Sequence, residues 1–150
     1  MIYLDNAATS WPKPDIVYTT MDQFLRKTGA NPGRAGHKMA VEAERMILET
    51  RARLARFFNA PAAERVIFTL NATDSLNIAL KGLLKPGDHV ITSHLEHNSV
   101  VRPLNRLMAL RIEVTRVVND PFSNIDLEHL RKSIRPNTRL IVINHASNRE

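Results

Sequence analysis

The spacing of apolar positions changes near residue 65 of this chain. Before that point it predicts a helix from about Pro14 to Lys27 and a longer helix from about Met39 to Asn59. The first ten residues form an extended arm in this interpretation, and a loop over 29–38, punctuated by glycines, separates the two helices. The apolar face expected for the longer helix consists of Ala43, Ile47, Leu54 and Phe58.

From residue 65 onward, short apolar and β-branched runs alternate with helical patterns. The predicted strands are 65–69, 89–92, 112–118 and 140–144, and the predicted helices are 73–84, 98–110 and about 126–134. This alternation implies right-handed crossovers and a largely parallel sheet. The strand at 140–144 is so apolar that burial on both faces is expected. The positions expected to point inward from the helix at 98–110 are Val100, Leu104, Leu107 and Met108.

Polar residues follow three of the predicted strands. They are Asn71 and Thr73 after the first strand, Glu96 and His97 after the second, and His145 and Asn148 after the last. Ligands of open α/β sheets bind beyond the carboxyl ends of the strands. We therefore expect these three strand ends to contribute to one shared site.

The turn Asn71-Ala72-Thr73-Asp74-Ser75 joins the first predicted strand to a helix. It would place free backbone N–H groups, together with the hydroxyls of Thr73 and Ser75, at the start of that helix. Such a helix start binds phosphate, because its N–H groups lack partners within the helix and its dipole favours an anion. The alternative interpretation is that Thr73 or Asp74 only caps the helix.

Two histidines, His94 and His97, lie three residues apart after the strand at 89–92. One interpretation is a metal pair, and a second is a ring that stacks on a planar ligand. A metal site needs further ligands at suitable spacing, and the sequence offers no third partner, so no metal site is predicted. The structural alternative is a histidine that caps the following helix.

Composition narrows the class of protein further. The 150 residues carry a net charge of +6 and no cysteine, which excludes a disulfide framework and a thiolate metal site. No apolar run approaches the roughly 20 residues that span a bilayer, and no secretory signal is recognisable. We therefore expect a cytoplasmic protein. Arginines and glutamates alternate along the helix at 39–59, as on a solvated helix face, so neither nucleic acid nor membrane is predicted as a partner.

Five segments together resemble the class V aminotransferase-like enzymes, and within them the cysteine desulfurase and selenocysteine lyase group. The segments, in chain order, are Tyr3-Leu4-Asp5-Asn6-Ala7-Ala8-Thr9 with Pro12-Lys13-Pro14, Asn31-Pro32-Gly33-Arg34-Ala35-Gly36-His37, Phe68 to Asn77, Glu96-His97-Asn98-Ser99, and Asn144-His145-Ala146-Ser147-Asn148. They extend over nearly the whole chain and occur in the order that the family has.

This resemblance implies pyridoxal 5′-phosphate (PLP) as cofactor and an α/β fold. The fold is the three-layer, mostly parallel sheet of a PLP fold-type I large domain, here truncated. Residues 1–38 would form an N-terminal arm, a first helix and a glycine-rich loop. Residues 39–150 would form the N-terminal half of the large domain. The family further implies a cytoplasmic homodimer.

The resemblance also implies roles for individual residues. Ala72 and Thr73 would hold the phosphate, by backbone N–H and hydroxyl. His97 would lie over the pyridine ring and act catalytically as a proton relay, while Asn148 would reach the phenolic oxygen of the ring. Asn6 and Ala7 in the arm would approach the substrate.

The chain departs from the family pattern at several positions. Asn71 and Ala72 replace a more usual Gly-Thr pair, and Asn98 replaces a second histidine. The sequence stops at Arg149-Glu150, whereas the Schiff-base lysine, its supporting residues and the nucleophilic cysteine of the family come later. We therefore expect a fragment that is inactive and poorly stable by itself.

The function that the resemblance implies is that of the N-terminal portion of a PLP-dependent cysteine desulfurase. Such an enzyme, a transferase or lyase, removes sulfur from L-cysteine to leave L-alanine, and a sulfur-acceptor protein is a possible partner. One alternative is another class V aminotransferase or lyase. An alternative of a different class is a non-catalytic phosphate-binding module.

Overall fold

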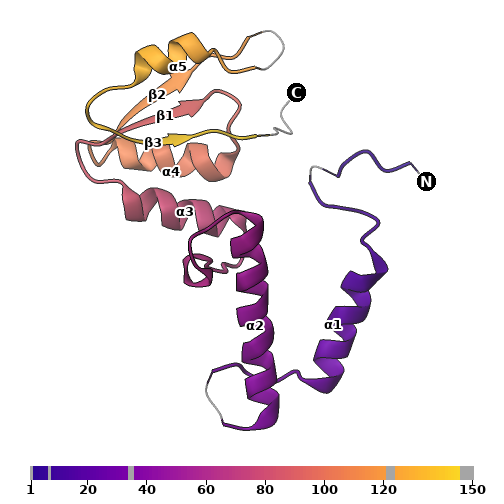
Figure 1. Ribbon diagram of the computed structural model, residues 1–150. Coiled ribbons are helices and arrows are strands. Elements are labelled where there is room, and N and C mark those ends of the chain that lie inside the picture. The colour runs from indigo at the N-terminus through magenta and orange to yellow at the C-terminus, as the bar shows by residue number, and fades with distance from the viewer. Residues whose placement is uncertain (1, 7, 34–35, 121–123, 146–150) are drawn as a thin grey trace. The chain divides into compact units, whose positions relative to one another are not determined.

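The protein is described here by a computed structural model. The residues that it describes are 2–6, 8–33, 36–120 and 124–145. The chain divides into two compact units, Met1–Phe68 and Thr69–Glu150 (Figure 1). The division expected from the sequence, into 1–38 and 39–150, concerns a larger parent enzyme and stays a prediction. None of the helices in the described residues combines the length and the hydrophobicity of a membrane span.

The first unit contains the two helices predicted before residue 65. α1 spans Asp15–Lys27 and α2 spans Lys38–Phe57, close to the predicted bounds. After α1 the chain turns at Gly29, which has a φ of +22°. A Cβ atom there would lie 2.8 Å from the carbonyl oxygen of Leu25. Glycine therefore allows the chain to leave the helix at this point.

The apolar face predicted for α2 is only partly buried. Ala43 is buried, and Ile47 and Leu54 are half-buried. Phe58 is 71% exposed, and its ring contacts that of Phe57 edge-on with centroids 4.9 Å apart. The prediction for Phe58 was wrong because this residue stands at the end of α2 and is left largely uncovered, although its N–H still bonds to the Leu54 carbonyl at 2.9 Å.

The strand predicted over 65–69 does not form in the described chain. A short 3-10 helix, η1 (Ala63–Arg65), leads into extended chain that pairs with no strand, and Ile67 is 75% exposed. The prediction was wrong because an apolar, β-branched run becomes a strand only where a neighbouring strand satisfies its N–H and C=O groups. The Phe68 ring instead faces the guanidinium of Arg51 on α2, which lies 5.8 Å from the ring centroid.

The second unit alternates helices and strands as the sequence predicts. Its elements are α3 (Ala72–Leu83), β1 (His89–Ser93), α4 (Asn98–Met108), β2 (Glu113–Val117), α5 (Leu127–Ser133) and β3 (Thr138–Val142). β1 lies between β2 and β3 and pairs with both in parallel. This mixed fold with its parallel sheet confirms the predicted α/β class.

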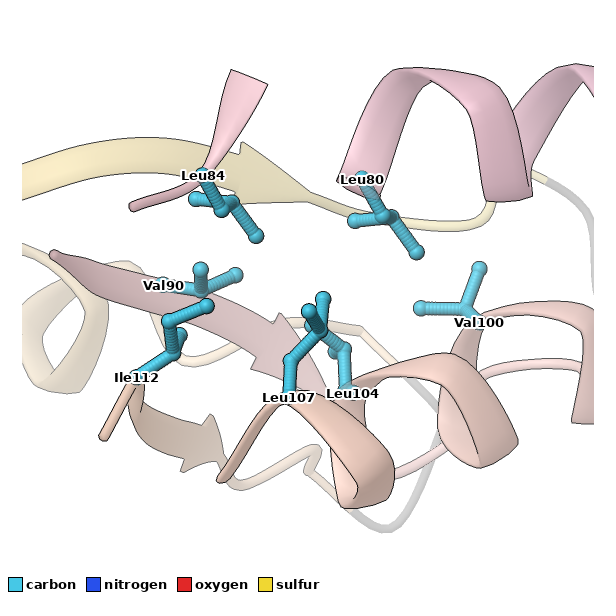
Figure 2. Close-up of a cluster of buried hydrophobic side chains, with 7 residues drawn as sticks. All are labelled: Leu80, Leu84, Val90, Val100, Leu104, Leu107 and Ile112. Atoms are coloured by element: carbon cyan, nitrogen blue, oxygen red, sulfur yellow. The ribbon is translucent and has the colours of Figure 1, made fainter. Parts of the chain in front are cut away.

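Helices cover both faces of the sheet, which gives three layers (Figure 1). α3 and α4 pack against each other on one face, and α5 packs against β2 on the other. Figure 2 shows the core between α3, α4 and the sheet, made by Leu80, Leu84, Val90, Val100, Leu104, Leu107 and Ile112. Met108 is 45% exposed, contrary to prediction. It is the last residue of α4 and points about 100° around the helix from Leu107, which occupies the inward side.

β3 is less buried than its apolar sequence indicated. Ile141 is 44% exposed, and burial alternates along the strand. The prediction of burial on both faces was wrong because, within the described residues, β3 is an edge strand that pairs with β1 alone. α5 packs against β2 and leaves the outer face of β3 open.

A buried histidine at the start of β1 links all three strands. His89, the first residue of β1, has no exposed surface. Its Nδ1 lies 2.8 Å from the Thr138 hydroxyl of β3, and its Nε2 lies 2.8 Å from the Thr115 hydroxyl of β2. Burial, and secondarily the positive charge of Arg135, lower the pKa of His89, while Glu113 opposes this shift.

Candidate functional site

Asn71 caps the start of α3. Its side-chain Oδ1 accepts a hydrogen bond from the Asp74 N–H at 2.9 Å, and its carbonyl accepts one from the Ser75 N–H at 3.1 Å. The alternative of a helix cap at Thr73 or Asp74 therefore named the wrong residues. Asn71 was not predicted as the cap because the helix was expected to begin at residue 73, whereas it begins at Ala72.

The cap leaves three donors at this helix start without a partner in the described chain. Within the described chain, no acceptor is recorded for the backbone N–H groups of Ala72 and Thr73 or for the Thr73 hydroxyl. The Ser75 hydroxyl, by contrast, bonds with the Thr69 hydroxyl and the Asn71 carbonyl. Of the two hydroxyls expected to meet an anion, only that of Thr73 is available. The arrangement favours an oxyanion at Ala72 and Thr73.

His97 caps α4. Its Nδ1 accepts a hydrogen bond from the Ser99 N–H at 3.1 Å and lies 2.7 Å from the Ser99 hydroxyl. The structural interpretation, a histidine that caps the following helix, thus holds for His97. Because Nδ1 accepts, the proton of the neutral ring resides on Nε2. The cap therefore fixes the ring and leaves Nε2 and the ring faces for a ligand.

Thr73 and His97 line the same cavity. It lies between α3 and α4 and has a volume of about 500 Å³. Its lining consists of Thr73, Asn77 and Lys81 from α3, and of His97, Asn98, Ser99, Arg102, Pro103 and Arg106 from the start and body of α4. The structure thus brings together the starts of two helices that the sequence nominated independently.

A buried carboxylate supports this edge of the sheet. Glu96 is 2% exposed, and its Oε1 accepts hydrogen bonds from the Ser93 hydroxyl and from the Asn144 N–H, both at 2.7 Å. Ser93 ends β1, and Asn144 lies just beyond β3. The sequence singled out Glu96 as a polar residue after a strand, but it gave no sign that this carboxylate joins two strand ends.

The remaining candidate residues are not brought together by the structure. Asn6 lies in the first unit, where its Oδ1 accepts a hydrogen bond from the Trp11 N–H at 3.1 Å. Ala7 and Asn148 lie outside the described residues. In the part of the chain that the structure describes, no group of three or more His, Asp or Glu side chains could hold a metal ion. The proposed roles of all these residues stay predictions.

Sequence reasoning missed four residues of the cavity. Asn77 and Lys81 follow Thr73 at spacings of four along α3, and Arg102 and Arg106 are four apart on α4. Residues at this spacing share one face of a helix. A search for polar stripes on the two helices that follow the candidate strand ends would have found them.

The class V aminotransferase family model matches residues 2–150 of the chain. The chain belongs to this family. Among its class V relatives, the cysteine desulfurase IscS of Dictyoglomus turgidum is 38% identical over 98% of the chain. A probable cysteine desulfurase of Synechocystis is 33% identical over 99% of the chain.

Solved structures of class V enzymes agree with this assignment. The apo structure of a cysteine desulfurase from Thermococcus onnurineus NA1 superimposes with a TM-score of 0.88, at 34% identity over 98% of the chain. A structure described as SspA in complex with cysteine gives a TM-score of 0.85, at 31% identity over 99% of the chain. These neighbours have the PLP fold-type I architecture that the sequence predicted.

The chain corresponds to less than half of each of these proteins. It spans 38% of the Dictyoglomus protein and 36% of the Synechocystis protein. It spans 37% of the Thermococcus chain and 43% of SspA.

Proposed function

We propose that this chain forms the N-terminal part of a PLP-dependent cysteine desulfurase, which removes sulfur from L-cysteine to leave L-alanine. One observation carries the proposal: the free helix start at Thr73 and the oriented ring of His97 line a single cavity. The relatives named cysteine desulfurases, and SspA in complex with cysteine, favour L-cysteine as the substrate.

The residues present fit the phosphate of PLP. The unpartnered N–H groups of Ala72 and Thr73 and the Thr73 hydroxyl offer three donors at the positive end of a helix dipole. A phosphate dianion accepts such bonds strongly because it is charged. No carboxylate lines the cavity to oppose it.

When bound, PLP supplies an electron sink for charge that develops on the amino-acid substrate. His97 would lie over the pyridine and could relay a proton through Nε2, which its cap leaves without a partner in the described chain. Asn148 would accept or donate at the phenolic oxygen, and Asn6 and Ala7 would contact the substrate. These three roles follow from the family resemblance.

The lysine and the thiol that this chemistry requires are not supplied by recognisable residues here. The chain contains no cysteine, and Lys81 is the one lysine that lines the cavity described above. We therefore propose that the 150-residue chain has no desulfurase activity by itself. Activity would belong to a longer, cytoplasmic homodimer that passes sulfur to an acceptor protein, with residues 1–38 and 39–150 in the roles given above.

Titration with PLP tests the proposal directly. PLP should bind the 150-residue chain more tightly than pyridoxal, which lacks the phosphate, and a change in the cofactor absorbance should report binding. Thr73→Val should weaken PLP binding by roughly 1–3 kcal/mol, the cost of losing a hydrogen bond to a charged group. Thr50→Val, on the exposed surface of α2, is the matched control.

Three outcomes would contradict the proposal. Equal affinity for PLP and pyridoxal would mean that no phosphate site exists at Thr73. If PLP binding depends on the phosphate but is unaffected by Thr73→Val, the phosphate binds at a site other than Thr73. Binding of PLP and inorganic phosphate with equal affinity would favour the non-catalytic phosphate-binding module instead.

A further inference from the structure

Three cationic side chains line the cavity between α3 and α4 beyond the proposed cofactor end. They are Lys81 on α3 and Arg102 and Arg106 on α4. In the described residues none of them forms an ion pair, and the cavity lining includes no aspartate or glutamate. Arg102 and Arg106 are also four residues apart on one helix, where like charges repel. Among the described residues, the three cations of this cavity therefore have no ion-pair partner, although Asp74 lines an adjoining hollow together with Lys81.

The cations lie at increasing depth from the carboxyl edge of the sheet. α3 leads into the first residue of β1 and α4 leaves from its last, so both helices begin at that edge. At a rise of about 1.5 Å per residue, Lys81 lies about 12 Å along α3 from Thr73. Arg106 lies about 10 Å along α4 from Ser99 by the same measure. A single phosphate held at Thr73 cannot neutralise charges this far along the helices.

We propose that this part of the cavity, which we call the α3–α4 groove, is a second anion site. Its ligand would be a small molecule with two or more phosphate groups, held by Lys81, Arg102 and Arg106. Guanidinium groups bind phosphate oxygens in pairs and remain charged at any physiological pH. The whole cavity, including the proposed cofactor end, has a volume of about 500 Å³, a size that suits small molecules, so a small polyphosphate is favoured over an acidic protein segment.

Inorganic pyrophosphate is the probe that tests this site. Calorimetric titration of the 150-residue chain at low salt should give saturable binding. The double variant Lys81→Gln/Arg106→Gln should weaken that binding at least about tenfold, because it removes two charge-assisted contacts. The double variant Lys85→Gln/Arg131→Gln removes the same charge at exposed positions outside the groove and should bind like the unmodified chain.

The remaining outcomes separate this proposal from the one on PLP. Pyrophosphate binding that persists when PLP is saturating supports two sites, whereas mutual exclusion overturns the second site. Equal weakening in both double variants would mean attraction by net charge alone and would also overturn it. If poly-glutamate binds the groove more tightly than pyrophosphate does, the ligand of the groove is an acidic protein segment and the small-molecule proposal is overturned. Failure of PLP to bind, with pyrophosphate binding intact, would contradict only the cofactor proposal.

Discussion

The backbone N–H of Asn144 donates a 2.7 Å hydrogen bond to Oε1 of Glu96, a residue 48 positions earlier in the chain. The same oxygen accepts the Ser93 hydroxyl at 2.7 Å, and the Glu96 side chain is almost completely buried. A buried carboxylate is tolerated when donors compensate for its lost hydration. Glu96 therefore joins the ends of β1 and β3, next to His97 on one side.

Removing this carboxylate should destabilise the second unit. Glu96→Ala leaves the Ser93 hydroxyl and the Asn144 N–H without their acceptor, at a cost of roughly 2–4 kcal/mol in the free energy of unfolding. Urea denaturation measures the change. Glu96→Gln keeps an acceptor oxygen and should recover a substantial part of the loss. Glu128→Ala, an exposed glutamate of α5, is the control. An alanine variant at position 96 as stable as the unmodified chain would refute the structural role.

Two substitutions at His97 should separate its role as a helix cap from its proposed role in binding the cofactor. His97→Ala removes both and should cost about 1 kcal/mol of stability. His97→Asn retains a good helix cap, so its stability should return to that of the unmodified chain while PLP affinity and the cofactor absorbance stay altered. Chelators should have no effect on PLP binding. Full recovery of PLP binding in His97→Asn would mean that His97 acts only as a helix cap. Stoichiometric zinc bound to the chain would support the metal interpretation instead.

The sequence predicted those structural features that depend on residues close together in the chain. The helix bounded by Asp126 begins where expected because its carboxylate accepts from the His129 N–H at 2.9 Å. The alternation of strands and helices after residue 65 predicted parallel pairing because short connections leave few topologies. The sequence placed Thr73 and His97 together because each was expected to follow a strand of one sheet; the strand before Thr73 does not form, yet both residues line one cavity since α3 packs beside α4.

The features that the sequence did not predict depend on contacts between residues that lie far apart in the chain. Ile67 is apolar and β-branched, as is typical of residues in strands, yet the described chain provides no strand beside it. Ile141 is apolar on a face that no described helix covers. No prediction from the sequence concerned Arg102, which lines a cavity only because α4 packs beside α3. Side-chain spacing defines a face, but only the tertiary structure defines what that face meets.

The stability of the second unit should fall as the pH is lowered below about 6.5. His89 has its pKa lowered in the folded chain, from a usual value of 6.5, chiefly by burial. The unfolded chain therefore binds the proton more readily, so the stabilisation from neutral His89 is fully present above pH 6.5 and is lost as the pH falls through the folded-state pKa. The Thr138 hydroxyl, which lies 2.8 Å from Nδ1 of His89, also accepts a hydrogen bond from the backbone N–H of Arg135 at 2.8 Å.

Urea midpoints measured between pH 7.5 and pH 5 test this dependence. His89→Gln should flatten the profile, whereas His145→Gln, which replaces an exposed histidine, should leave it unchanged. An unmodified chain whose midpoint is constant over this range would show that the His89 ring is equally basic in the folded and unfolded states.

The outer face of β3 should cause the chain to self-associate. Ile141 on this edge strand is 44% exposed and Ile143 beyond it is 36% exposed. Exposed apolar edge strands can pair with another chain. Ile141→Lys adds a charge to the edge and should shift the chain toward monomer in light scattering. Ile134→Lys makes the same change after α5, at a residue 53% exposed, and should leave the association unchanged.

Thermal melting gives an independent measure of the same property. With this surface open, the 150-residue chain should melt with weak cooperativity, and its apparent transition should depend on protein concentration. A monodisperse monomer with a sharp, concentration-independent transition would contradict the prediction. It would mean that the two units form a complete domain, and it would strengthen the alternative of a stand-alone phosphate-binding module.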